Sequence, residues 1–283
     1  MTALDLPDMP DTPDRPDTHE VMVFTDLDGT LLDHDSYSFE VALPALEALA
    51  AARIPVVPVT SKTLAELEPL MAALSLSGAA IAENGAVIKL ADGRIDRATT
   101  RQEIMAVVAA LPDEVRRAMR CFSDMSVADI AAAAGLSPDA AALAAQREAS
   151  EPFLWRSATT PEDAGLRSLD TALDTALDTA VEEAGFCLTQ GGRFHHIIPP
   201  RDKADAIALL LAEQNPRPVV WALGDGPNDI AMLLAADRGA LIANPHIDTQ
   251  KHLPPGHNLY ISAKTGPQGW RDAIATFLGH NFE

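Results

Sequence analysis

The stretch VFTDLDGTLLD, residues 23–33, indicates the fold class because it places charge at the end of an apolar run. Residues 21–24 have the continuous apolar character of a buried parallel strand, and Gly29 marks the turn that ends it. Asp26 and Asp28 follow directly. Carboxylates at such a point need a neutralising partner, so the stretch predicts a functional site at the carboxyl end of this strand.

The rest of the chain alternates predicted strands with predicted helices on both sides of a long middle segment. Strand alternating with helix is typical of an α/β protein with a doubly wound parallel sheet. We expect strands over 21–26, 54–60, 218–224, 239–243 and 258–262, and helices over 42–52, 62–74, 203–213 and 228–236.

The middle segment differs from the flanking segments in composition and pattern, which predicts an inserted α+β cap domain over residues 92–196. It is rich in alanine, and Leu169, Leu173, Leu177 and Val181 form an apolar stripe at helical spacing. The core domain is then expected from 20–91 and 197–283, after a disordered acidic Pro/Asp tail over 1–19.

Composition limits the classes of partner. The formal net charge is −20, which argues against a nucleic-acid or anionic-membrane surface. No stretch approaches the ~18 apolar residues of a membrane span and no signal-peptide pattern opens the chain, so we expect a cytoplasmic protein. Cys121 and Cys187 lack the spacing of metal ligands, and we expect both to be small buried hydrophobes rather than a disulfide. The oligomeric state is left open.

Functional groups follow several of the predicted strands. Asp26 and Asp28 follow the first, Thr60 the second, and Asp225 and Asp229 the strand that ends in WALGDGPND. Ligands of open parallel sheets bind at this edge, so we expect these groups to meet in one pocket. Hard carboxylate and carbonyl oxygens suit Mg²⁺, which would neutralise the converging charge.

The combination of DLDGTLLD, a strand-terminal Thr60, Lys203 at the start of a late helix and GDGPND resembles the four-motif pattern of haloacid dehalogenase superfamily phosphatases. The resemblance implies a Rossmann-like core. It also implies an aspartyl-phosphate formed on Asp26, with Asp28 as general acid and base. Thr60 and Lys203 would contact the phosphoryl group.

The same resemblance implies the ligands of the Mg²⁺ ion. The carboxylates of Asp26 and Asp225 and the backbone carbonyl of Asp28 would bind it. Asp229 would act at the metal either directly or from the supporting shell, together with Asn228.

Further stretches are similar to mannosyl-3-phosphoglycerate phosphatases, namely PVVPVTSKT, ENG, GLSPDAAALAAQRE, GGRFHH and LGDGPND. This resemblance implies hydrolysis of mannosyl-3-phosphoglycerate to mannosylglycerate, a compatible solute, and phosphate. An arginine at the site would grip the carboxylate of such a phosphorylated sugar-glycerate. The substrate-binding residues it implies are Ser61, Lys62, Glu83, Asn84, Arg193, His196 and Asn228.

Several alternatives remain open from the residues alone. The substrate could be glucosyl-3-phosphoglycerate, sucrose 6-phosphate or another hexose phosphate. A phosphomutase would keep both Asp26 and Asp28, and a catalytically inactive sugar-phosphate sensor would use the pocket for binding only. Ala204 and Gly226 depart from the residues usual in the family, although neither change removes a ligand or an acid.

Overall fold

The computed structural model describes residues 21–156, 170–190 and 194–280. The core is a parallel sheet whose strands are ordered β12-β11-β10-β1-β2, so the predicted parallel α/β core is confirmed. Its strands are β1 (Val21–Thr25), β2 (Val56–Pro58), β10 (Val219–Gly224), β11 (Arg238–Ala243) and β12 (Tyr260–Thr265).

Helices cover both faces of this sheet. Val23 on β1 belongs to the apolar cluster under one set of helices, and the next residue, Phe24, belongs to the cluster under the other set. This alternation makes the sheet doubly wound. The first set is α1 (Leu43–Ala51), α2 (Leu64–Ala73) and α11 (Gly266–Leu278), and the second is α9 (Lys203–Ala212) and α10 (Ile230–Ala235).

A small antiparallel sheet continues from the core. It consists of β3 (Ala80–Ala82), β4 (Val87–Lys89) and β5 (Ile95–Arg97), and Ile81 bridges Val59 in parallel beyond the end of β2. The predicted domain boundary at residue 92 falls inside the β4–β5 hairpin. The exact boundaries therefore stay a prediction.

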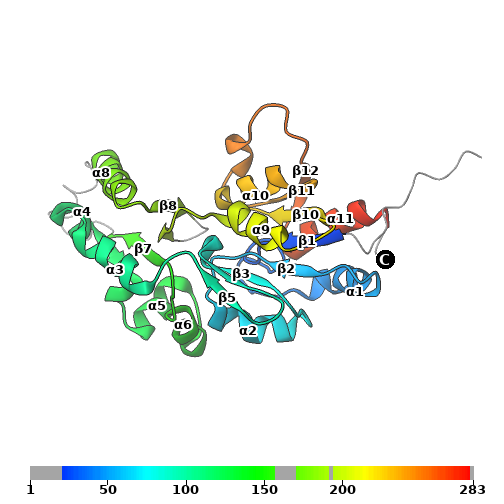
Figure 1. The fold of residues 1–283 in the computed structure, drawn as a ribbon, viewed down its shortest axis with the longest axis horizontal. Coiled ribbons are helices and arrows are strands. Elements are labelled where there is room, and N and C mark those ends of the chain that lie inside the picture. The colour runs from blue at the N-terminus through cyan, green and yellow to red at the C-terminus, as the bar shows by residue number, and fades with distance from the viewer. Residues whose placement is uncertain (1–20, 157–169, 191–193, 281–283) are drawn as a thin grey trace, which may run out of the picture.

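The inserted segment forms a second layered unit, as Figure 1 shows, with α3, α4 and α8 at the opposite end of the molecule from α1 and α11. Its antiparallel sheet has the order β6-β7-β9-β8. The strands are β6 (Met119–Cys121), β7 (Glu151–Trp155), β8 (Cys187–Gln190) and β9 (His195–Ile198), and the helices are α3 (Arg101–Ala110), α4 (Asp113–Ala118), α5 (Val127–Ala134), α6 (Pro138–Ala144) and α8 (Asp170–Glu183).

The predicted apolar stripe of the cap is confirmed on α8. Leu173, Leu177 and Val181 are buried in the cap core, whereas Leu169 lies outside the described residues. The prediction that both cysteines are buried is right for Cys121 and wrong for Cys187. Cys187 is exposed because β8 is an edge strand that, among the described strands, pairs only with β9.

Within the described ranges, no single helix is long and apolar enough to cross a membrane. The pair α5 and α6, bent by 102°, passes that test jointly by length and composition only.

Candidate active site

The turn after β1 brings its carboxylates against the end of β10. The backbone N–H of Leu32 donates to the carbonyl of Leu27, and Gly29 adopts a φ of +84°. A Cβ on Gly29 would lie 2.7 Å from Oδ2 of Asp225. Both the left-handed backbone and the close approach require glycine here, so the DGT sequence allows the first motif to meet the fourth.

A buried lysine links the carboxylates at this edge. Lys203 opens α9, which the side chain of Asp202 caps by accepting from the N–H of Asp205. The ammonium of Lys203 donates to Oδ1 of Asp26 and to Oδ1 of Asp229, both at 2.6 Å, and only 1% of the Lys203 side chain is exposed. Burial opposes its charge, but the two carboxylates outweigh this effect and raise the pKa of Lys203.

Asp225 sits in a dense set of hydrogen bonds. The Thr30 hydroxyl donates to its Oδ1 and the Asn244 amide to its Oδ2, each at 2.7 Å. Burial and the nearby charge of Asp229 raise the pKa of Asp225 to about 7. Asp229 uses its remaining Oδ2 to accept the backbone N–H groups of Asp225 and Gly226.

This cluster fits a divalent cation. Asp26, Asp225 and Asp229 place candidate ligand atoms within 4.8 Å of one another, while Lys203 supplies a single buried positive charge. Burial raises the pKa of Asp26 well above its ordinary value and Lys203 opposes the shift. A second cation beside the lysine would favour the ionised form of these carboxylates. The Asp229 carboxylate accepts three hydrogen bonds, one from Lys203 and two from backbone N–H groups, and the Asp225 carboxylate accepts two, so Asp229 has the smaller remaining capacity for direct coordination.

Asp28 faces the open side of the same pocket. Its Oδ2 lies 2.8 Å from the ammonium of Lys62, while its Oδ1 is buried without a hydrogen-bond partner among the described residues. Lys62 also stands over the Tyr37 ring, 5.0 Å from its centre. Lys62 is thus placed to orient Asp28, and Oδ1 of Asp28 keeps its capacity to accept a further hydrogen bond.

Thr60 and Ser61 follow β2 but differ in their surroundings. Thr60 is 1% exposed, and its hydroxyl accepts from the backbone N–H of Lys62 at 3.3 Å. Ser61 and Lys62 line the pocket, and Thr60 is not among the described lining residues. The Thr60 hydroxyl therefore shapes the loop that presents Ser61 and Lys62.

Glu83 and Asn84 lie behind the pocket wall rather than on it. Both have positive φ, 51° and 59°, which is costly for residues other than glycine and often marks functional turns. The fully buried Glu83 carboxylate accepts from the backbone N–H groups of Glu148 and Ala149 and from the Ser150 hydroxyl. It thus ties the core to the cap.

Asn84 connects the same turn to the fourth motif. Its Oδ1 accepts from the Asn228 amide at 3.1 Å, and Asn228 lines the pocket. Its Nδ2 is buried and has no hydrogen-bond partner among the described residues. Asn84 and Asn228, each predicted to bind substrate, lie in contact, and of the two Asn228 lines the pocket.

The cap lines its side of the pocket with a cationic side chain and aromatic side chains. Arg147, on the segment after α6, donates from Nη1 to the Ser61 carbonyl at 2.5 Å and from Nε to the Ala144 carbonyl at 3.1 Å. Its guanidinium also lies 5.7 Å from the centre of the Phe122 ring, and Phe194 lines the same wall.

The two histidines of β9 face opposite ways, as strand alternation requires. His195 stacks on Phe153 in the cap, with ring centres 5.3 Å apart. His196 lines the pocket, and its buried Nδ1 lacks a hydrogen-bond partner among the described residues. Burial and the positive charge of Arg147 hold the pKa of His196 well below its usual range, so the imidazole is neutral. The other predicted cap residue, Arg193, lies outside the described residues.

Comparison with known proteins decides the family. A family model described as haloacid dehalogenase-like hydrolase matches residues 23–131. A glucosyl-3-phosphoglycerate/mannosyl-3-phosphoglycerate phosphatase of Persephonella marina is 32% identical over 278 residues, covering 91% of this chain and 97% of the relative. The chain belongs to the haloacid dehalogenase superfamily. It is a phosphoric monoester hydrolase of the sugar-phosphate type.

Solved structures agree on the fold of this hydrolase. A crystal structure from Thermoplasma acidophilum has a TM-score of 0.65 at 20% identity, covering 90% of this chain and 97% of its own. The sucrose-phosphatase of Synechocystis sp. PCC6803, solved with sucrose and phosphate, has a TM-score of 0.60 at 16% identity, covering 91% and 98%. Hydrolases of this superfamily generally use Mg²⁺, and the buried carboxylates could bind such an ion.

Sequence reasoning missed several residues that build the site of this phosphatase. Asn244 follows β11, so the rule that ligands bind at the carboxyl ends of strands could have found it. Thr30 stands in the DGT turn, and its hydroxyl next to the carboxylates was a usable signal. Arg147 lies in the stretch GLSPDAAALAAQRE, but only the folding of the cap shows that it reaches the core.

Proposed function

We propose that the protein is a Mg²⁺-dependent phosphatase that hydrolyses mannosyl-3-phosphoglycerate to mannosylglycerate and phosphate through an aspartyl-phosphate. The observation that carries this proposal is one pocket lined by Asp26, Asp28 and Asp225 from the core and by Arg147 and His196 from the cap. One small molecule bound in this pocket can place its phosphate at the core carboxylates and its own carboxylate at the cap.

The chemistry proceeds in two displacements on phosphorus. A carboxylate oxygen of Asp26 bonds to phosphorus while the bond to the glycerate oxygen breaks, and Asp28 donates a proton to that leaving oxygen. Asp28 then removes a proton from a water whose oxygen attacks phosphorus, which releases phosphate and restores Asp26. Lys203 orients Asp26 and supplies positive charge beside the phosphoryl oxygens.

The residues present fit the implied ion. The carboxylates of Asp26 and Asp225 and the backbone carbonyl of Asp28 would hold Mg²⁺, with Asp229 in support. When bound, the ion would supply positive charge to the phosphoryl oxygens.

Substrate selection falls to the cap in this proposal. Two N–H groups of Arg147 bond to the Ser61 and Ala144 carbonyls, and the guanidinium has three more for a carboxylate. Neutral His196 presents an unpartnered ring nitrogen that suits a sugar hydroxyl better than an anion. Glucosyl-3-phosphoglycerate is the second candidate, because the Persephonella marina relative is named as a phosphatase of both the glucosyl and the mannosyl compound.

Phosphate release tests the proposal. Mannosyl-3-phosphoglycerate, its glucosyl analogue, sucrose 6-phosphate and an aryl phosphate would be compared with Mg²⁺ and with chelator, using Asp26→Asn as control. We expect chelator and the variant to abolish release, and the glycosyl-phosphoglycerates to exceed the other esters by about 10²-fold in kcat/KM, which corresponds to roughly 2.7 kcal/mol. Comparable weak rates on every ester would refute the substrate assignment, and turnover by Asp26→Asn would refute the nucleophile.

A further inference from the structure

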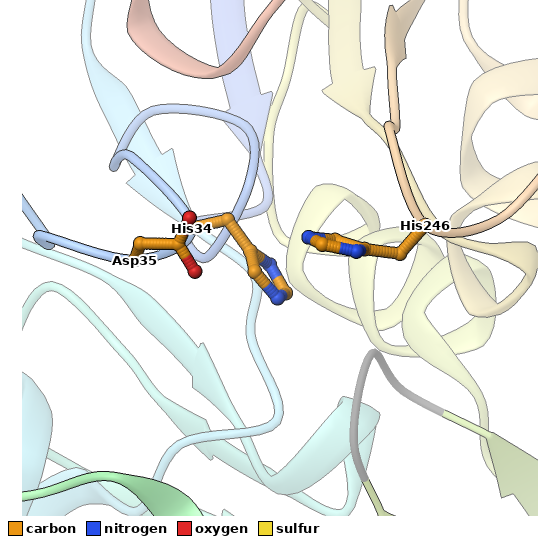
Figure 2. A group of neighbouring side chains, drawn as sticks. All are labelled: His34, Asp35 and His246. Atoms are coloured by element: carbon orange, nitrogen blue, oxygen red, sulfur yellow. The ribbon is translucent and has the colours of Figure 1, made fainter.

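A second cluster of metal-ligating side chains lies beside the catalytic pocket. His34 and Asp35 come from the loop after β1, and His246 comes from the loop after β11. Each offers a candidate ligand atom, and these atoms lie within 4.8 Å of one another. Figure 2 shows the two imidazole rings directed toward each other from the two loops, with the Asp35 carboxylate on the His34 side.

The spacing of the rings fits a shared ion. The ring centres of His34 and His246 are 4.6 Å apart, with their planes tilted by 41°. With Zn–N bonds of about 2.1 Å, two imidazoles on one ion place their ring centres roughly 5 Å apart. Small side-chain rotations would therefore bring both rings and the carboxylate onto one metal.

Local hydrogen bonds hold both ligand loops. Oδ1 of Asp33 accepts from the backbone N–H of Asp35 at 3.2 Å, and Oδ1 of Asn244 accepts from that of His246 at 2.8 Å. The amide of Asn244 meanwhile donates to Asp225. The His246 loop is thus attached to the catalytic carboxylates, while its imidazole points to the other loop.

We propose that His34, Asp35 and His246 form a transition-metal site of the Zn²⁺ class, separate from the Mg²⁺ centre. Two imidazoles and one carboxylate suit Zn²⁺ or Co²⁺, whereas Mg²⁺ prefers an all-oxygen set such as that of Asp26 and Asp225. Three protein ligands leave an open coordination position. Because His34 lines the catalytic pocket, an ion here stands at the edge of the space that substrate anions enter.

Cobalt binding to the full-length protein in excess Mg²⁺ tests this site. We expect one Co²⁺ per chain with visible absorption bands, displaced by Zn²⁺, and an affinity that falls by at least about 10-fold in His246→Ala. His252→Ala removes another exposed histidine and is the matched control, with affinity unchanged.

The Asp26→Asn variant distinguishes the two sites. It damages the catalytic carboxylate cluster and should retain the cobalt bands. Bands that disappear in Asp26→Asn but persist in His246→Ala would place the ion at the catalytic centre and overturn the proposal. Absence of stoichiometric Co²⁺ binding in excess Mg²⁺ would overturn it equally, and would leave the proposed phosphatase reaction unaffected.

Discussion

The core wall and the cap wall of the pocket differ in the kind of polar groups that they carry. At the core wall, Asp26, Asp225 and Asp229 share Lys203, backbone N–H groups and neighbouring side chains. At the cap wall, His196 keeps a buried nitrogen without a partner among the described residues. The Asp26, Asp225 and Asp229 carboxylates are held by hydrogen bonds within the core, whereas Oδ1 of Asp28 on the same wall, like Nδ1 of His196, has no partner among the described residues. Under the proposed function, the acidic core cluster serves the chemistry, and Arg147 and His196 of the cap serve substrate selection.

Lys203→Met removes the buried cation of the core wall and should have the largest effect on catalysis. We expect kcat to fall by about 10²- to 10³-fold on every phosphate ester, because a preorganised charge beside the phosphoryl group is lost. Steady-state kinetics on the glycosyl-phosphoglycerate and on an aryl phosphate check this result. The exposed Lys264→Met is the control, and a Lys203→Met enzyme within tenfold of wild type would contradict the role.

Glu83→Gln should loosen the junction between the two walls. The buried carboxylate accepts three hydrogen bonds from the cap segment that follows Arg147, and glutamine would turn a donor toward those donors. We expect the free energy of unfolding to fall by about 2–3 kcal/mol in urea denaturation, and KM for the glycosyl substrate to rise.

Glu148→Gln is the matched control for this change, because it removes only the partly exposed ion pair with Arg97. Its cost should stay below about 1 kcal/mol. Equal losses in the two variants would show that Glu83 does not hold the cap.

The protonation of Asp225 makes the stability of the folded protein depend on pH. Its pKa of about 7 in the metal-free protein lies above the ordinary value of 3.8, so protonation favours the folded state. That contribution is fully present below about pH 4 and is lost as the pH rises through about 7. Under the proposed function, Mg²⁺ at Asp225 would compete with the proton, so the increase in Tm on adding Mg²⁺ should be several degrees larger at about pH 8 than at about pH 6. Asp225→Asn should reduce the difference, while Asp26, whose pKa burial also raises, maintains a part of it. A pH-independent increase in wild type would contradict this prediction.

His196→Phe tests the cap wall and should have the smallest effect on kinetics of these variants. Losing one hydrogen bond from a neutral imidazole to a sugar hydroxyl should raise KM for the glycosyl substrate by about 3- to 10-fold and leave the aryl phosphate unchanged. His195→Phe, which alters the packing on Phe153, is the control. An equal rise in KM for both substrates would remove His196 from sugar recognition.

The parallel core and its acidic groups could be predicted because they are encoded locally. Asp26 and Asp225 each follow an apolar strand, and parallel strands bring such ends together. On the cap wall, His196 could be predicted, whereas Arg147 could not, because Arg147 reaches Ser61 across 86 positions of sequence through the packing of an inserted domain. Glu83 illustrates a third case. Its motif was recognised, but the cap backbone that occupies its carboxylate was invisible in the sequence.

The most direct test of the division between the walls is kcat/KM of wild type and Arg147→Ala on mannosyl-3-phosphoglycerate, its glucosyl analogue and an aryl phosphate. Loss of charge-assisted hydrogen bonds to a carboxylate predicts a fall of about 10- to 100-fold on the two glycosyl-phosphoglycerates and a change within about twofold on the aryl phosphate. An equal fall on all three esters would contradict the account, since Arg147 would then serve the chemistry of the core rather than the choice of substrate.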